Sequence, residues 1–454
     1  MSELIVSSEL ASSSDQIQVA CALCARPRRE LIQITDLDPT LATLALNAVA
    51  PGQLPVGVCA RCVDILKRAQ RLIETYPEAF SETRFALPTW VRMDADEQFT
   101  GKGVTMAFLD SGFYSHDDLT KPESRIVAYH SIFDSEDDRT SLTTTDAASW
   151  HGMMTSVVAA GNGHLSDGFY RGIAPDSNLV LVKIGRTGRI SEEQIQTGLE
   201  WVLKNREKHN IRIVNISAGG DSEKSYLDST LCQAVEQAVK AGLVVVCAVG
   251  NAGLAPGHPV LPPASSPSSI AVGGLDDQNS LDRAKRGMYR SSYGPTIDGL
   301  QKPEIIAPGI WVAGPILPST PTADQAELCS KLEAAEDKEL KSIIEANEGV
   351  DQDFDQSRDL PVPLLRQLIS IKLREGNVIN QHYKYIDGTS FAAPIVSSIV
   401  ACMLEANPRL TPQIVKRILM DTAERVTGVE VERQGWGVVT PRRAVEVALS
   451  WVHR

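Results

Sequence analysis

Three segments of the sequence carry the residue types that nucleophilic catalysis needs. The first, GVTMAFLDSGFYSHDDL, places Asp110 at the C-terminal end of an apolar run that predicts a buried strand. The second, WHGMMTSVVAAGNG, places His151 at the start of small and apolar residues that predict a tightly packed helix. The third, YIDGTSFAAPIVSSIVACML, places Ser390 at the start of an apolar helix. Together they could supply a nucleophile, its base and a carboxylate that orients the base.

The role of each side chain follows from its ordinary chemistry. A serine hydroxyl is a poor nucleophile until a base removes its proton. His151, whose pKa lies near neutrality, can take that proton and return it to a leaving amine. Asp110 would hold the imidazole in the required tautomer and stabilise its cation. Each segment alone is weak support, because most Asp, His and Ser residues are structural or solvated, but the three in this order are hard to obtain by chance.

The surrounding elements predict an α/β fold. From about residue 103, five short and nearly continuous apolar runs suit strands buried on both faces of a parallel sheet: GVTMAFLD, NLVLVKI, IRIVNIS, GLVVVCAVG and SSIAVGG. Amphipathic segments such as ISEEQIQTGLEWVLKNREK lie between them. Strands that alternate with helices predict a three-layer sandwich with a mostly parallel central sheet. Catalytic sites in such sheets form at the carboxyl ends of the strands, where Asp110 is expected.

These segments resemble the subtilisin-like serine peptidase family, over roughly residues 100–318 and 381–450. The order Asp, His, Ser is that of the family. Further blocks match in order: RGIAPDSNLVLVKI, IVNISAGG, VVVCAVGNAG, PASSPSSIAVGG and SSYGPTIDGLQKPEIIAPG. The resemblance implies the subtilisin-like fold and a serine endopeptidase that works through an acyl-enzyme. In the family a Thr usually follows His-Gly, where Met153 stands here, and this departure leaves activity expected because that Thr is not part of the proton relay.

The resemblance also implies two binding features. The Asn251 amide would donate to the oxyanion together with the Ser390 backbone N–H, although Asn is also a common turn residue. Ser217, Ala218 and Gly219 resemble the strand to which the family's peptide substrates add. The alternative for that segment is an ordinary strand end that leads into a turn.

Two CxxC pairs precede the part that resembles the family. Cys21 and Cys24, followed by Cys59 and Cys62, could give four-thiolate tetrahedral coordination, which suits a structural Zn²⁺. The alternatives are a redox pair, a disulfide pair or coincidence. A catalytic metal is not expected, because four thiolates leave no open position, and catalysis requires no cofactor.

The chain divides by composition into a flexible tail at 1–18, a four-cysteine module at 19–95 and the peptidase domain at 96–454. An acidic helical insertion at 319–380 interrupts the peptidase domain, and its residues 321–376 hold 13 acidic and 7 basic side chains. Loops this long are usually functional or disordered. We expect a lid, a specificity element or an activation switch, the alternative being a solvated helical decoration.

Bulk properties narrow the class of protein. The chain has 454 residues, 43% hydrophobic and 22% charged, and a net charge of −13, which argues against nucleic-acid binding through bulk electrostatics. We expect no secretory signal, because the first residues, MSELIVSSELASSSDQIQ, lack a basic start followed by an apolar run. No membrane-spanning segment is expected either. Half of the eight cysteines fall in the CxxC pairs and the others are scattered, which favours a cytoplasmic protein with reduced thiols.

Together these features predict an intracellular, regulated endopeptidase that acts on proteins or peptides. A regulatory protein partner could bind through the N-terminal module or the acidic insertion. The alternative from another class is a binding or scaffold protein with a vestigial triad. A non-proteolytic serine hydrolase is disfavoured by the peptide-binding strand motif.

Overall fold

The computed structural model describes residues 86–134, 139–186 and 190–452, and before them 19–20, 27–28, 31–32, 37, 57–60, 62–64, 66–67 and 70. The chain forms two compact units, one of Met1–Glu74 with Leu281–Ala284 and one of Thr75–Ser280 with Lys285–Arg454. In the first unit, strand β1 (Val19–Ala20) pairs antiparallel with β2 (Pro27–Arg28). An antiparallel bridge joins Ile32 to Val58.

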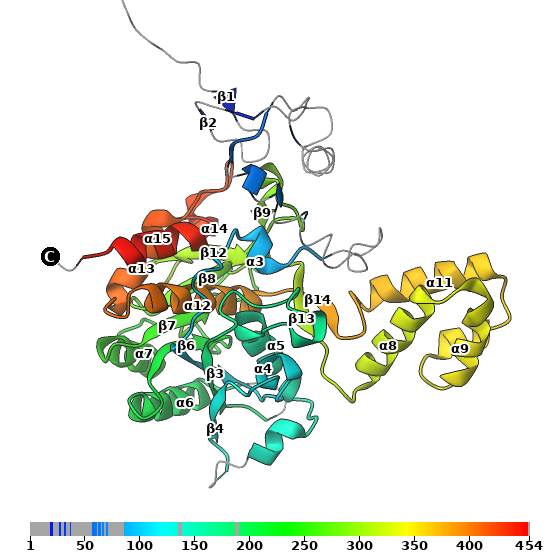
Figure 1. Ribbon diagram of the computed structural model, residues 1–454. Helices are drawn as coiled ribbons and strands as arrows, with labels where there is room; N and C mark the ends of the chain where they lie inside the picture. Colours follow the sequence, from blue (N-terminus) through cyan, green and yellow to red (C-terminus); the bar gives the residue numbers. More distant parts are fainter. Residues whose placement is uncertain are drawn as a thin grey trace, which may run out of the picture. The chain divides into compact units, whose positions relative to one another are not determined.

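A mostly parallel sheet forms the centre of the second unit (Figure 1). Seven parallel strands lie in the order β12-β8-β7-β6-β3-β5-β4, and β9 pairs antiparallel with β8. Their bounds are β3 (Thr105–Asp110), β4 (Ile126–Ser131), β5 (Asn178–Lys183), β6 (Ile211–Ile216), β7 (Val244–Ala248), β8 (Ile270–Asp276), β9 (Gly287–Met288) and β12 (Ile305–Pro308). The predicted α/β class with a mostly parallel sheet is confirmed, and all five apolar runs form strands of it.

Helices cover both faces of this sheet. On one face, α6 (Glu192–Asn205) and α7 (Thr230–Lys240) share an apolar core with β3, β5, β6 and β7. Each begins after a serine, Ser191 or Ser229, whose side chain accepts a backbone N–H of the first turn. α12 (Thr389–Ala406) packs on β6, β7, β8 and β12, and also on α5 (Ser149–Ala160) and α15 (Pro441–Ser450). The remaining elements of the body are α3 (Thr89–Arg92), α4 (Asp117–Thr120), α13 (Pro412–Thr422), α14 (Val431–Gln434), β10 (Gly294–Pro295) and β11 (Gln301–Lys302).

α12 is the central apolar helix of the fold. Among the described residues it is the one helix long and apolar enough to cross a membrane, but 83% of its apolar window is buried in the protein. That burial is typical of a core helix. Pro394 lies inside the helix and is itself buried. Ser390, in the first turn, therefore lies on a helix that is mostly buried in the core.

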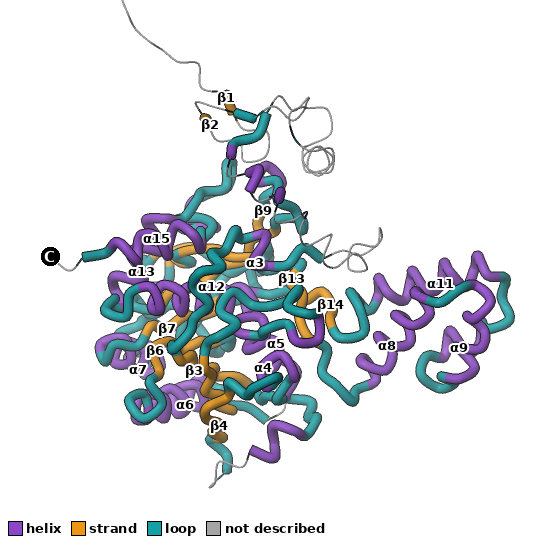
Figure 2. The backbone as a smooth tube through the Cα atoms, viewed as in Figure 1, coloured by secondary structure: helices purple, strands orange, loops and turns teal. Residues whose placement is uncertain are grey.

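The insertion is helical (Figure 2). Its helices share an apolar core of their own. α8 (Pro321–Ala334), α9 (Leu340–Ala346), α10 (Gln352–Ser357) and α11 (Val362–Glu375) follow one another between β13 (Val312–Pro315) and β14 (Tyr383–Ile386). β13 and β14 pair antiparallel and close the base of the insertion. The buried core residues all lie between Ile316 and Val378. The segment is therefore helical, as predicted.

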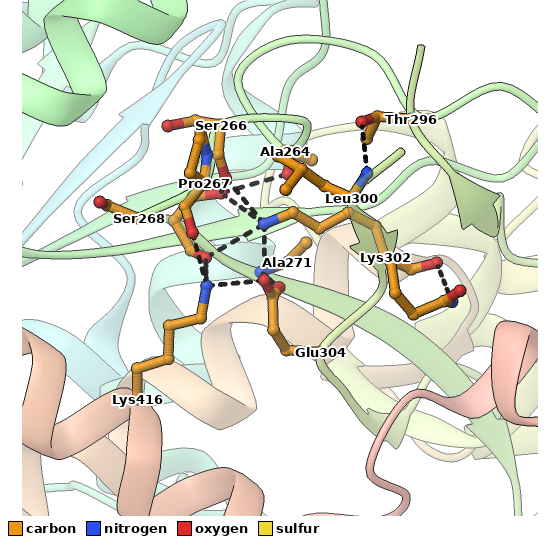
Figure 3. A network of polar contacts seen from close by, with 12 residues as sticks. Ala264, Ser266, Pro267, Ser268, Ala271, Thr296, Leu300, Lys302, Glu304 and Lys416 are labelled. Carbon is orange, nitrogen blue, oxygen red and sulfur yellow. Dashed lines mark hydrogen bonds and ion pairs between the residues drawn. The ribbon is translucent and has the colours of Figure 1, made fainter. Parts of the chain in front are cut away.

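A buried polar network fixes the segment that leads into β8 (Figure 3). The Lys302 ammonium donates to the carbonyl of Ser266 at 2.7 Å and to Glu304 Oε1 at 2.6 Å. Lys416, on α13, donates to the same Glu304 oxygen at 2.6 Å and to the carbonyl of Ser269 at 2.8 Å. Burying charges is tolerable only when they are paired and hydrogen-bonded in this way. The network ties the 266–269 segment to α13 and to the segment that joins β11 to β12.

Candidate active site

Asp110 and His151 form a direct hydrogen-bonded pair. Asp110 is the last residue of β3 and is 2% exposed, and His151 lies in the first turn of α5. His151 Nδ1 lies 2.8 Å from Asp110 Oδ1 and 3.0 Å from Oδ2. An Asp carboxylate is acceptor-only when ionised, so the proton of the pair sits on Nδ1 and Nε2 is left as the basic nitrogen.

Two features bring this pair together and hold it. A Cβ on Gly152 would lie 2.1 Å from the carbonyl oxygen of Gly112 and 2.9 Å from Asp110 Cβ, so α5 can approach the end of β3 only with glycine at this position. The carboxylate also accepts from Ser111 N at 2.8 Å and from Thr155 Oγ1 at 3.2 Å. Sequence reasoning missed Thr155, although a hydroxyl four residues after His151 lies on the same helix face.

The environment of His151 favours its protonated form. Burial of the imidazole disfavours the cation, but the charge of Asp110 and its hydrogen bond outweigh burial, and the pKa of His151 is raised above its ordinary value. The ring of Trp150 meets the imidazole edge-on at a centroid distance of 5.2 Å, and Phe391 lies at 5.8 Å. Met153, the departure from the family pattern, is fully buried.

Ser390 lies in the first turn of α12, after a glycine with an uncommon backbone conformation. Gly388 has φ 135°, a region that residues with a side chain rarely adopt. The Ser390 Oγ contacts the carbonyl of Ser217 at 3.5 Å, and Ser217 Oγ donates to the Ser390 carbonyl at 2.9 Å. The first N–H groups of a helix have no partner within it. The Ser390 N–H therefore has no acceptor within α12 and can donate to a group bound beside Ser390.

The amide of Asn251 is oriented by Thr389. Its Oδ1 accepts from the Thr389 N–H at 2.9 Å and from Thr389 Oγ1 at 3.1 Å. Because a backbone N–H can only donate, the atom that faces it is the oxygen, and Nδ2 points the other way. A Cβ built on Gly388 would lie 3.7 Å from both Asn251 Nδ2 and Ser390 N. The two donors therefore border the same small space, as an oxyanion site requires.

Two adjoining pockets contain all of the peptidase-site residues expected from the sequence. Asp110 and His151 line one of about 520 Å³, with Trp150, Arg186 and Ile190 among the other lining residues. Asn251, Thr389 and Ser390 line the other, of about 300 Å³, with Pro259 and Leu261. The segment Ser217–Ala218–Gly219 lines both. None of the lining residues comes from the acidic insertion.

The structure leaves the zinc prediction untested. Cys59 and Cys62 are buried, at 3% and 5% exposed, but Cys21 and Cys24 lie outside the described residues. Within the described ranges, no group of three or more His, Cys, Asp or Glu side chains is arranged to hold a metal ion. Cys59 and Cys62 are the two expected ligands that the structure describes.

Comparison with known proteins confirms the resemblance read from the sequence. The model of the "Subtilase family" matches residues 101–437. Serine protease AprX of Bacillus subtilis (strain 168) is 30% identical over 77% of this chain and 67% of its own length. Subtilisin BL of Lederbergia lenta is 32% identical over 47% of this chain and 66% of its own length. The alkaline protease of Alkalihalobacillus alcalophilus is 32% identical over 47% of each chain.

Solved structures agree on the fold. The CspB protease of Clostridium perfringens aligns with a TM-score of 0.57 and 16% identity, over 79% of this chain and 97% of that chain. Fervidolysin from Fervidobacterium pennivorans, a keratinolytic enzyme related to subtilisin, aligns with a TM-score of 0.52 and 21% identity, over 79% of this chain and 45% of that chain. At these identities the likeness supports the subtilisin-like fold alone.

The raised pKa of His151 predicts the pH dependence of peptide hydrolysis. The base must be neutral, so kcat/KM should rise with pH through a midpoint above the ordinary imidazole value of 6.5 and be lost as pH falls through it. Asp110→Asn removes the charge that raises this pKa, so the midpoint should move to lower pH while activity falls by about 10⁴. The control is Asp117→Asn at a half-exposed carboxylate on α4, which should leave the midpoint unchanged. A wild-type midpoint below 6.5 would contradict the assignment.

Proposed function

The chain belongs to the subtilase family and is a subtilisin-like serine peptidase, and we propose that it is an endopeptidase. In this proposal Ser390 is the nucleophile, His151 is the base and Asp110 is the carboxylate that orients the base. The observation that carries the proposal is the Asp110–His151 hydrogen bond at 2.8 Å, in a pocket that adjoins the one holding Ser390 and Asn251. The scaffold alternative has no comparable support, because a vestigial site has no need to keep these groups in order.

The proposed reaction proceeds by acyl transfer. Ser390 Oγ attacks the scissile carbonyl carbon while its proton passes to His151 Nε2, and Asp110 stabilises the resulting imidazolium. The oxyanion of the tetrahedral intermediate accepts from Asn251 Nδ2 and the Ser390 N–H. The imidazolium then protonates the leaving amine as the C–N bond breaks. Water then attacks the acyl-enzyme while His151 Nε2 takes a proton from it. The imidazolium returns that proton to Ser390 Oγ as the ester bond breaks.

The segment Ser217–Gly219 favours a peptide as substrate. It runs between the two pockets and its glycine faces open space, since a Cβ on Gly219 would meet no atom closer than the Pro262 carbonyl at 4.0 Å. The next N–H, of Gly220, donates to that carbonyl at 2.6 Å, which holds the end of the segment in place. An extended peptide could therefore pair along this edge, with its scissile bond beside Ser390.

Ser390→Ala should abolish peptide hydrolysis and leave the fold intact. Loss of the nucleophile costs about 10⁶ in turnover in subtilisin. The measurement is kcat on a chromogenic peptide, with circular dichroism to show that the variant is folded. The matched control is Ser398→Ala on the same helix, whose hydroxyl donates only to the carbonyl one turn back and should be dispensable for turnover. Hydrolysis that survives Ser390→Ala in a clean preparation would remove Ser390 from the mechanism, and an inert wild type would favour the scaffold alternative.

We also propose a structural zinc on Cys21, Cys24, Cys59 and Cys62, in a protein that works in the reducing cytoplasm. The support is the paired CxxC spacing and the burial of Cys59 and Cys62. Such a module could dock a regulatory partner. It is not expected to take part in the chemistry.

Metal analysis of the dialysed protein should give about one zinc per chain, because four thiolates bind Zn²⁺ tightly. Replacing Cys21 and Cys24 by Ser should release the metal and leave hydrolysis of a small peptide unchanged. The control, Cys402→Ser, removes a buried thiol from α12 and should keep the zinc. A folded, metal-free protein that gains no zinc on reconstitution under reducing conditions would contradict the site.

The acidic insertion is proposed as a docking element for protein substrates or a regulatory partner. It has its own core, contributes no lining residue to either pocket, and joins the body through β14, which ends four residues before Ser390. Its excess of acidic over basic side chains would attract basic segments. An element that is joined to the Ser390 loop through β14 but lines neither pocket suits docking better than a closed lid.

Replacing residues 320–378 by a short Gly/Ser linker should therefore lower cleavage of large basic protein substrates several-fold. The kinetics on a small chromogenic peptide should change by less than about twofold, because β13 and β14 remain to close the base. Parallel assays on both substrates at two salt concentrations measure this, since docking through charge weakens as salt rises. A variant that gains activity on both substrates would show gating instead, and equal kinetics before and after deletion would leave the insertion as decoration.

A further inference from the structure

The loop that carries Ser390 is anchored on both sides of Gly388. After the glycine, Thr389 is held by Asn251 Oδ1 at 2.9 Å. At the glycine, the Gly388 N–H donates to the Gly309 carbonyl at 2.7 Å. Before the glycine, Asp387 Oδ2 accepts from the hydroxyl of Tyr289 at 2.8 Å. Because Gly388 has the conformational freedom of glycine, side-chain anchors on its two sides decide how the loop is held.

Tyr289 is held in place by contacts with the central sheet. It follows β9 and is 7% exposed, and its N–H donates to the Gly274 carbonyl at 3.1 Å. A Cβ on Gly274 would lie 2.8 Å from Tyr289 atoms, so the ring fits only because residue 274 is glycine. Gly309, whose carbonyl accepts from the Gly388 N–H, lies against the same ring. A Cβ built on Gly309 would lie 3.6 Å from Tyr289 Cδ1. The ring thus occupies one fixed place beneath the loop.

The direction of the tyrosine hydroxyl proton is also fixed. Arg290 Nε donates to the Tyr289 oxygen at 3.2 Å, and a guanidinium has no acceptor. The hydroxyl proton is therefore left for Asp387. Burial raises the pKa of Tyr289, which keeps the hydroxyl protonated and a donor across the range in which a histidine base works.

We propose that Tyr289 is a positioning residue for catalysis, which sets the Ser390 loop by its hydrogen bond to Asp387. The proposal rests on the proposed function of Ser390. Tyr289 lines neither pocket and so acts through the loop, without touching substrate. Loss of the hydrogen bond should slow attack by Ser390 Oγ, because small displacements of a nucleophile have large effects on rate. Substrate binding should be nearly unaffected.

The test compares Tyr289→Phe with Asp387→Ala and Asp387→Asn. The rate constant for labelling by a fluorophosphonate should fall about tenfold in Tyr289→Phe and in Asp387→Ala, with KM for a peptide within about twofold. Asp387→Ala also removes the exposed contact of Asp387 Oδ2 with Arg290 Nη2 at 3.4 Å, so the double variant should be no slower than Asp387→Ala alone. Asp387→Asn keeps an acceptor oxygen and should restore most of the rate. The matched control is Tyr293→Phe, a tyrosine stacked on His258 outside both pockets, which should label at the wild-type rate.

The outcomes separate this proposal from the proposed function. A wild type that does not label contradicts Ser390 as a nucleophile. A wild type that labels, with Tyr289→Phe equally fast, overturns the positioning role alone, and so does an Asp387→Asn variant as slow as Asp387→Ala. If Tyr289→Phe does not fold, the comparison of Asp387→Ala with Asp387→Asn still tests the hydrogen bond, because both variants lose the ion pair with Arg290 and only Asn keeps an acceptor oxygen.

Discussion

The hydrogen bond between Asp110 and His151 is the constraint on which the rest of the site depends. It requires the first turn of α5 to lie against the carboxyl end of β3, and the contact of Gly152 with the Gly112 carbonyl allows that approach. It also sets the electrostatics, because the charge of Asp110 outweighs the effect of burial on the imidazole. Once this pair is fixed, a nucleophile is useful only where Nε2 can reach it.

The second half of the site is positioned by the N-terminus of α12. The helix is held by the sheet beneath it, and its first residues are held by Asn251, Ser217 and the Gly309 carbonyl. These contacts leave the Asn251 amide and the Ser390 N–H facing one space. Preorganised donors of this kind stabilise a developing oxyanion without reorganising during the reaction. In the proposed mechanism, the packed core therefore fixes both donors before substrate arrives.

Sequence patterns predicted the parts of this arrangement that are local. Continuous apolar runs gave the five central strands, and the strand end and helix start gave Asp110, His151 and Ser390. β4 was not predicted, because it lies at the sheet edge, where one of its residues is exposed and the apolar run is broken. Thr155 and Tyr289 were not predicted, because their partners are set by packing. Tyr289 and Asp387 are 98 residues apart, and although Asp387 directly precedes Gly388, no sequence pattern links it to Tyr289. The zinc site stays a prediction, since Cys21 and Cys24 lie outside the described residues.

The mechanism is tested most directly by locating the covalent adduct that a fluorophosphonate forms with the whole protein. Peptide mass spectrometry should find one adduct per chain, on Ser390, formed faster as pH rises through the raised pKa of His151 and almost absent in His151→Ala. An adduct on another serine, or labelling of Ser390 that is independent of His151, would contradict a nucleophile activated by the Asp110–His151 pair.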